Sequence, residues 1–217
     1  MSYFLLMACC SFAQHQNDLV LTSGLRFERK ISRSFSAILN TQYSFNQNLE
    51  ELGYHYYDLG VMYKYNSHFS GEFHYRYIKF RNLENFYDDR QMPYIDLSYS
   101  KSRKNFSFEL RTRFQETFYG LHFAPTYRPP SIYNRNKFIV SYHVNYYISP
   151  YASLEIYYPL NNSSLRKKIN QWRETIGIYY TFNRYYRIEA YYQVQDLTNR
   201  IHKLTNYVMG VTGYYRF

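Results

Sequence analysis

The chain has 217 residues, a length that favours a single domain. Aromatic residues make up 22% of it, and Tyr alone occurs 30 times, which is far more than the core of an ordinary soluble domain requires. The formal net charge is +10, but the 26 Lys and Arg residues are spread along the chain without a basic helix or a base-stacking module. The composition therefore argues against a nucleic-acid partner.

An uncharged apolar segment, Tyr3 to Ala13, lies at the start of the chain. It is too short to cross a bilayer as a helix. Ser11 and Ala13 place small residues at the two positions that an export peptidase reads. We therefore expect a signal peptide over residues 1–13 and a mature domain over residues 14–217.

The same segment contains both cysteines of the chain, Cys9 and Cys10. Leu6-Met7-Ala8-Cys9 also resembles a lipoprotein box, in which Met7 fits poorly, so lipidation is the alternative interpretation. If the segment is removed as a signal peptide, the mature chain has neither a disulfide framework nor a cysteine metal site.

Residues 19–31 alternate between apolar and polar side chains with a period of two. Leu21 and Leu25 share one parity, whereas Arg26 and Glu28 hold the other. This period predicts a strand with one apolar face, not a helix. A second alternating run follows at residues 35–45, after a polar turn, so the two runs are predicted to form a hairpin.

The alternating pattern recurs to the end of the chain. Further runs lie at residues 57–65, 69–77, 95–99, 106–114, 138–148, 152–158, 172–182, 188–194 and 207–217. The total is about eleven strands, most of them long enough for the roughly 9–11 residues that a tilted membrane strand needs. We therefore predict an all-β fold, a single antiparallel up-and-down transmembrane β-barrel of about 10–12 strands.

Short turns alternate with longer connections along the predicted barrel. The longer connections span residues 46–53, 82–92, 119–136, 161–170 and 197–204. Outer-membrane barrels put short turns in the periplasm and long loops outside, so Phe217 is predicted to end the chain on the periplasmic side. Single-chain bacterial barrels have an even number of strands, so a count of eleven would start the first strand on the opposite side.

Three segments resemble a known family. Phe108–Gln115, Tyr147–Glu155 and Gly210–Phe217 are similar to the outer-membrane barrels grouped as domain of unknown function 2490. The resemblance implies a barrel in the bacterial outer membrane. It implies no activity and no catalytic residue, because none is established for the family.

The final strand has aromatic residues at Tyr215 and Phe217. An aromatic end of this kind resembles the signal that the outer-membrane insertion machinery reads. A soluble antiparallel strand would also have an end, but the side-chain pattern favours the insertion signal. We therefore expect the insertion machinery to be a partner of this protein.

The polar parity of the predicted strands carries charges of both signs, which a barrel would enclose. This luminal charged network comprises Asp58, Glu72, His74, Arg76, Asp96, Glu109, Arg111, Arg113, Glu155, Arg173 and Glu189. Enclosed charges must be paired or hydrated. They therefore form either a salt-bridge lattice that fills the lumen or the wall of a narrow passage for small solutes.

The sequence contains no motif of a serine hydrolase elbow, a zinc protease or a phosphate loop. An outer-membrane lipid-modifying enzyme of the phospholipase kind is one alternative, and a soluble β-barrel that binds a ligand in an aromatic interior is another. His74, Ser141 and His143 fall on the luminal parity, so we interpret Ser141 and His143 as a hydrogen-bonded luminal pair. We predict no catalytic, cofactor-binding or metal-binding residue.

Two predicted outer loops are basic. Their cations are Arg166, Lys167, Lys168, Arg200 and Lys203. Such cations could bind the phosphates of lipopolysaccharide through charge-assisted hydrogen bonds. The alternative is that both loops are simply solvated.

Overall fold

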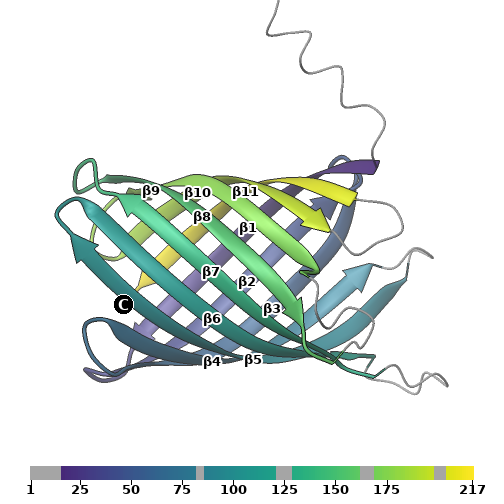
Figure 1. Ribbon diagram of the computed structural model, residues 1–217, viewed down its shortest axis with the longest axis horizontal. Helices are drawn as coiled ribbons and strands as arrows, with labels where there is room; N and C mark the ends of the chain where they lie inside the picture. Colours follow the sequence, from purple (N-terminus) through teal and green to yellow (C-terminus); the bar gives the residue numbers. More distant parts are fainter. Residues whose placement is uncertain (1–15, 82–85, 121–128, 162–168, 198–203) are drawn as a thin grey trace, which may run out of the picture.

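The computed structural model describes residues 16–81, 86–120, 129–161, 169–197 and 204–217. The predicted signal peptide over residues 1–13 lies outside the described residues. Within the described part of the chain, eleven strands close into one barrel (Figure 1). No helix in that part is long and apolar enough to cross a membrane. The predicted all-β barrel and its range of 10–12 strands are thus confirmed.

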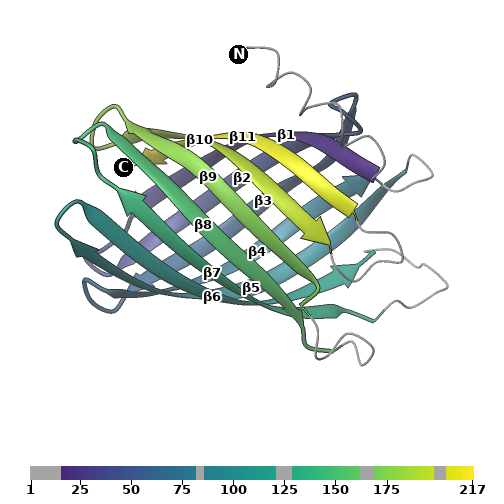
Figure 2. The ribbon, with the colours of Figure 1, turned by 45° about the horizontal axis from the view of Figure 1, so that its top comes forward.

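The strands follow the barrel wall in chain order. They are β1 (Gln16–Lys30), β2 (Phe35–Asn46), β3 (Glu51–Lys64), β4 (Phe69–Arg81), β5 (Tyr87–Arg103), β6 (Phe106–Tyr119), β7 (Ser131–Tyr142), β8 (Ile148–Pro159), β9 (Gln171–Thr181), β10 (Tyr186–Leu197) and β11 (Leu204–Arg216). Each strand pairs antiparallel with the next one, so the chain runs up and down around the barrel (Figure 2).

The closure between β1 and β11 is parallel, with a register that runs from Gln16 opposite Leu204 to Glu28 opposite Arg216. This follows from the odd number of strands. Directions alternate around the wall, so the first and the eleventh strand run the same way. The first strand therefore begins at the end of the barrel opposite to Phe217, as the count of eleven implied.

One end of the barrel carries only short connections, and we call it the short-turn end. Its connections are residues 31–34, 65–68, 104–105, 143–147 and 182–185. Three of them use the same device: the Oδ1 atoms of Asn66, Asn145 and Asn183 each accept hydrogen bonds from the backbone N–H groups two and three residues ahead. Asn favours such turns because its side chain can replace a backbone acceptor.

The turn between β7 and β8 corrects a prediction. The alternating pattern continued through Val144, Tyr146 and Ile148, so a strand to residue 148 and a turn at Ser149-Pro150 were expected. The strand β7 ends at Tyr142 instead, and the turn occupies residues 143–147. The prediction was wrong because Asn145 closes the turn inside the apolar run.

The two faces of the wall have opposite polarity. Outward side chains are apolar and exposed, as Leu59 (64%) and Ile176 (63%) illustrate. Inward side chains are polar, and Ser44 and Asp58 are fully buried at 0% exposure. The apolar side chains therefore lie outside and the polar ones inside, the reverse of a soluble barrel.

A small polar group interrupts the apolar outer face on β6 and β7. Thr112 Oγ1 donates to Asn136 Oδ1 (2.9 Å), and Asn136 Nδ2 donates to Asn134 Oδ1 (2.6 Å). Asn134 Nδ2 donates in turn to the backbone carbonyl of Arg113 (3.3 Å). These polar groups satisfy one another, which lowers the cost of placing them on an apolar face.

Outward aromatic rings meet in pairs between neighbouring strands beside the short turns. The pairs are Phe35 with Tyr63, Phe69 with Tyr99, Phe106 with Tyr142, and Tyr186 with Tyr215, all with ring centroids 4.7–5.0 Å apart. Tyr215 also stacks on Phe217 (5.1 Å). Contacts of this kind stabilise neighbouring strands beyond the area they bury.

Candidate functional site in the barrel lumen

Asp58 on β3 is the centre of one polar cluster in the lumen. Its two carboxylate oxygens accept four hydrogen bonds. The donors are Asn40 Nδ2 (3.1 Å), His74 Nδ1 (2.5 Å), Arg76 Nε (2.7 Å) and Tyr94 OH (2.6 Å). These donors come from β2, β4 and β5, so a single buried carboxylate joins four neighbouring strands.

His74 extends this cluster toward the short-turn end. Its Nε2 lies 2.8 Å from Glu72 Oε2, and Glu72 forms an ion pair with Arg26 (3.3 Å). The His74 ring stacks almost flat on Tyr94, with centroids 4.7 Å apart. Gly60 on the neighbouring strand β3 is the register partner of His74, and a Cβ atom at residue 60 would collide with the His74 ring. Glycine is therefore required at residue 60 for the ring to lie against the wall.

Glu155 on β8 is the centre of a second cluster. It accepts hydrogen bonds from Arg111 Nη2 (2.7 Å) and from Arg135 Nη2 (2.9 Å). The nearest approach of Arg173 is 3.9 Å, which is longer than a hydrogen bond. Arg135 also donates to Gln115 Oε1 (2.9 Å). One carboxylate thus faces three guanidinium groups.

Asp96 and Arg113 connect the two clusters. Arg113 donates to both Asp96 oxygens at 2.6 Å, a bidentate arrangement that uses its Nε and Nη2 atoms. The same guanidinium lies 3.8 Å above the Tyr94 ring, which belongs to the Asp58 cluster. In the Asp58 cluster, the guanidinium of Arg76 lies 3.9 Å from the centroid of the Tyr56 ring. Aromatic rings therefore support the cations on the lumen wall.

A third cluster surrounds Glu189 on β10. Its carboxylate accepts hydrogen bonds from the hydroxyls of Tyr151 and Tyr214, the latter at 2.5 Å. Arg187 lies 4.5 Å from the ring centroids of both Tyr179 and Tyr214. Tyrosine hydroxyls, not cations, therefore satisfy this carboxylate.

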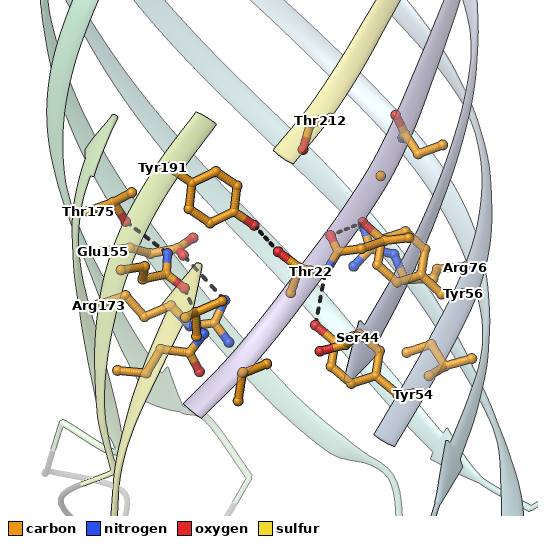
Figure 3. Close-up of a pocket in the computed structure, with 18 of the residues that line it drawn as sticks. Thr22, Ser44, Tyr54, Tyr56, Arg76, Glu155, Arg173, Thr175, Tyr191 and Thr212 are labelled. Carbon is orange, nitrogen blue, oxygen red and sulfur yellow. Dashed lines mark hydrogen bonds and ion pairs between the residues drawn. The ribbon is translucent and has the colours of Figure 1, made fainter. Parts of the chain in front are cut away.

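A cavity of about 520 Å³ remains between the clusters. Figure 3 shows Thr22 and Tyr191 meeting beside it, with Arg173 and Glu155 to one side and Tyr54 to the other. The contact between Thr22 Oγ1 and the Tyr191 hydroxyl measures 2.7 Å. The cavity wall is therefore polar and rich in tyrosine.

The charged residues that line this cavity are mostly cations. The cations are Arg26, Arg76, Arg90, Arg111, Arg113, Arg135, Lys137 and Arg173, whereas the carboxylates are Glu155 and Glu189. The remaining carboxylates of the clusters, Asp58, Glu72 and Asp96, do not line the cavity. The field inside the cavity therefore favours negative charge.

The residues predicted for the luminal network divide among the three clusters. Asp58, Glu72, His74 and Arg76 lie in the first cluster, and Arg111, Glu155 and Arg173 lie in the second. Asp96 and Arg113 connect these two, and Glu189 is the centre of the third. Glu109 lies on the same face of β6 as Arg111, but within the described residues it joins none of the ion pairs.

Sequence reasoning missed Arg135 and Lys137 in the second cluster. Residues 119–136 were interpreted as a loop, and β7 in fact begins at Ser131. The signal was present, because Arg135, Lys137 and Ile139 continue the luminal parity of the strand. Polar residues at Asn134 and Asn136 on the other parity hid the alternation.

His143 is not paired with Ser141, which corrects another prediction. It lies in the exposed turn between β7 and β8, where its Nε2 is 2.7 Å from Ser107 Oγ and its Nδ1 is 2.8 Å from Ser149 Oγ. The turn moves the ring away from the expected strand position.

Among the described residues, no group of three or more His, Cys, Asp or Glu side chains is placed to hold a metal ion.

The basic loop residues predicted to bind lipopolysaccharide are outside the described part of the chain. They are Arg166, Lys167, Lys168, Arg200 and Lys203. Their contact with lipid phosphates therefore stays a prediction. The role of Tyr215 and Phe217 as an insertion signal also stays a prediction, since the ring contacts describe their packing alone.

The apolar outer face, the polar lumen and the short turns at one end together define a β-barrel of the outer-membrane type. The chain belongs to the family described as "Protein of unknown function (DUF2490)", which matches residues 23–206. No curated protein matches the chain. The family resemblance noted in the sequence is thereby confirmed.

Solved structures with the same fold include a porin and the β domain of an autotransporter. The KdgM porin, solved in complex with disordered oligogalacturonate, is 13% identical with a TM-score of 0.50, and the match covers 92% of this chain and 99% of the porin. The β domain of the Bordetella autotransporter BrkA is 9% identical with a TM-score of 0.51, covering 81% of this chain and 82% of that domain. Similarity at this level concerns the fold alone.

Proposed function

We propose that this protein is a bacterial outer-membrane barrel that forms a narrow passage for small solutes. The observation that carries the proposal is the cavity of about 520 Å³ inside a closed barrel with a polar wall. An interior fully packed with side chains would leave no such space. The porin fold of a solved relative supports the proposal as an analogy of architecture.

The membrane location is supported by the outer surface. Exposed apolar side chains cover the outward face of the strands, and a soluble protein rarely exposes so large an apolar surface. The aromatic pairs beside the short turns fit a girdle at one membrane boundary, where an amphipathic ring can keep its hydroxyl in water. In this arrangement the short turns face the periplasm and the longer connections face outward.

The direction of the ion pairs favours a narrow passage over a salt-bridge lattice that fills the lumen. Arg76 with Asp58, Arg113 with Asp96, and Arg135 with Glu155 all join adjacent strands. A pair between adjacent strands holds both side chains along the wall instead of across the lumen. The pair of Arg26 on β1 with Glu72 on β4 spans more of the wall and narrows the space near the short-turn end.

The test is conductance of the purified protein in a planar bilayer. We expect discrete steps, and we expect Thr212→Trp to reduce them because Thr212 lines the cavity. Val211→Trp is the matched control, since Val211 lies on the same strand, faces outward and is 49% exposed. A folded protein that never conducts, or equal conductance in the two variants, would contradict the proposal.

A further inference from the structure

We propose that the lumen selects small oxyanions, carboxylates or phosphates, by binding them at a cationic belt formed by Arg111, Lys137 and Arg173. The inference deepens the proposed passage and rests on it for its physiological meaning. The binding site itself requires only the cavity and the charges that line it.

The belt is a row across four neighbouring strands. Arg111 on β6 is the register partner of Lys137 on β7, and Lys137 is the partner of Glu155 on β8. Glu155 is in turn the partner of Arg173 on β9. Register partners lie about 4.5–5.5 Å apart at their Cβ atoms, so the four side chains leave the wall side by side.

The belt and its neighbours hold more positive than negative charge. The cations are Arg111, Arg113, Arg135, Lys137 and Arg173, and the carboxylates near them are Asp96, Glu109, Glu155 and Glu189. The bidentate contact with Arg113 occupies both oxygens of Asp96. The remaining four cations face Glu155, Glu109 and Glu189, and Glu189 already accepts hydrogen bonds from two tyrosine hydroxyls. Positive charge is therefore in excess.

The belt also has hydrogen-bond donors without partners. Within the described residues, Lys137 makes no hydrogen bond or ion pair, although it lines the cavity. The Nε atoms of Arg111 and Arg173 are buried and lack a hydrogen-bond partner. A donor left without a partner away from water costs free energy, which a bound acceptor recovers.

Oxyanions fit this set of donors. A guanidinium presents N–H groups in a planar fork that matches two oxygens of a carboxylate or a phosphate, and an ammonium adds a point charge. Asp96 already provides an example, because Arg113 donates to one of its oxygens through Nε and to the other through Nη2, both at 2.6 Å. A cavity of about 520 Å³ lies in the usual range for a small-molecule site.

The short-turn mouth of the barrel would attract the same solutes. A hollow of about 530 Å³ there is lined by Lys30, Arg33, Lys64, Arg184 and Arg216, with Glu28 as the lining carboxylate. Glu28 is paired with Arg216 (3.0 Å). A mouth in which one sign of charge is in excess concentrates ions of the opposite sign. Both the mouth and the belt therefore favour anions.

The first measurement is the reversal potential of the conducting protein in a salt gradient. We expect chloride to permeate better than potassium. Lys137→Gln and Arg173→Gln should each lower the ratio of chloride to potassium permeability by about twofold, which is the effect expected from a screened unit-charge interaction over several ångströms. Lys137→Arg should keep the ratio. Lys101→Gln is the control, since it removes an equal charge from the exposed outer face. Cation preference, or equal effects of Lys137→Gln and Lys101→Gln, would overturn the inference.

The second measurement does not need a conducting protein. Sodium phosphate and sodium acetate are each titrated into the refolded barrel, with sodium chloride at equal ionic strength as the reference, and heat of binding is recorded. We expect saturable binding of at least one oxyanion that Lys137→Gln and Arg173→Gln weaken. Binding without conductance would support the belt and refute the proposed passage. Conductance without either saturable binding or anion preference would refute the belt alone.

Discussion

Replacing Asp58 by Asn tests whether the buried clusters hold the barrel together. Asn has the same shape but only one acceptor oxygen, so its amide group would face two of the four donors that now point at the carboxylate. The substitution therefore removes about two charge-assisted hydrogen bonds, each worth roughly 1.5–3 kcal/mol. We expect Asp58→Asn to lower the free energy of unfolding by about 3–6 kcal/mol.

The assay is urea unfolding of the protein refolded into lipid vesicles, followed by the shift of the folded band on unheated gels. Ser44→Ala is the control, because Ser44 is equally buried but uncharged, and its partners Asn46 (3.3 Å) and Tyr54 are uncharged side chains. We expect the control to cost about 1 kcal/mol or less. A loss from Asp58→Asn no larger than that of the control would show that the cluster is hydrated and contributes little.

Two further predictions concern the outer face and the end of the chain. Ile176 lies at the middle of β9 and is exposed on the outer face, so Ile176→Arg should lower the free energy of unfolding in vesicles by about 2–4 kcal/mol. Gln193 lines the cavity, so Gln193→Arg should lower it by less than about 1 kcal/mol. Equal losses would mean that the two faces are wrongly assigned. Deleting Phe217 should reduce the amount of protein in the outer membrane of cells more than it reduces stability in detergent, because burial of one terminal ring contributes only a few kcal/mol. Normal amounts in the outer membrane would refute the insertion signal.

Most of the wall could be predicted from the sequence because strand alternation is a local signal. In β1, Leu21 and Leu25 face outward while Arg26 and Glu28 face the lumen, as the period of two requires. The same rule assigned Asp58, His74 and Glu155 to the interior. Each of these assignments needs only the residues two positions away on the same strand.

The errors arose where a side chain changed the local pattern. Asn145 closes a turn inside an apolar run, so His143 lies in a connection and bonds to Ser107 and Ser149. On β7 the polar residues at Asn134 and Asn136 face outward, and the hydrogen bond that Asn136 accepts from Thr112 on β6 lies outside any single-strand pattern. Alternation predicts a strand only when one face is consistently apolar.

Which luminal charges meet could not be predicted from the faces alone. Arg26 and Glu72 form an ion pair although they lie on β1 and β4, and their meeting depends on the tilt and stagger of every strand between them. The charge balance is different, because it needs only the parity of each strand and the register of neighbours. Once β7 is recognised as a strand, Arg111, Lys137 and Arg173 fall in one row around Glu155. The proposed preference for anions can thus be derived from strand parity and register alone, whereas the individual ion pairs cannot. The preference would also persist if a change in side-chain conformation exchanged one ion-pair partner for another.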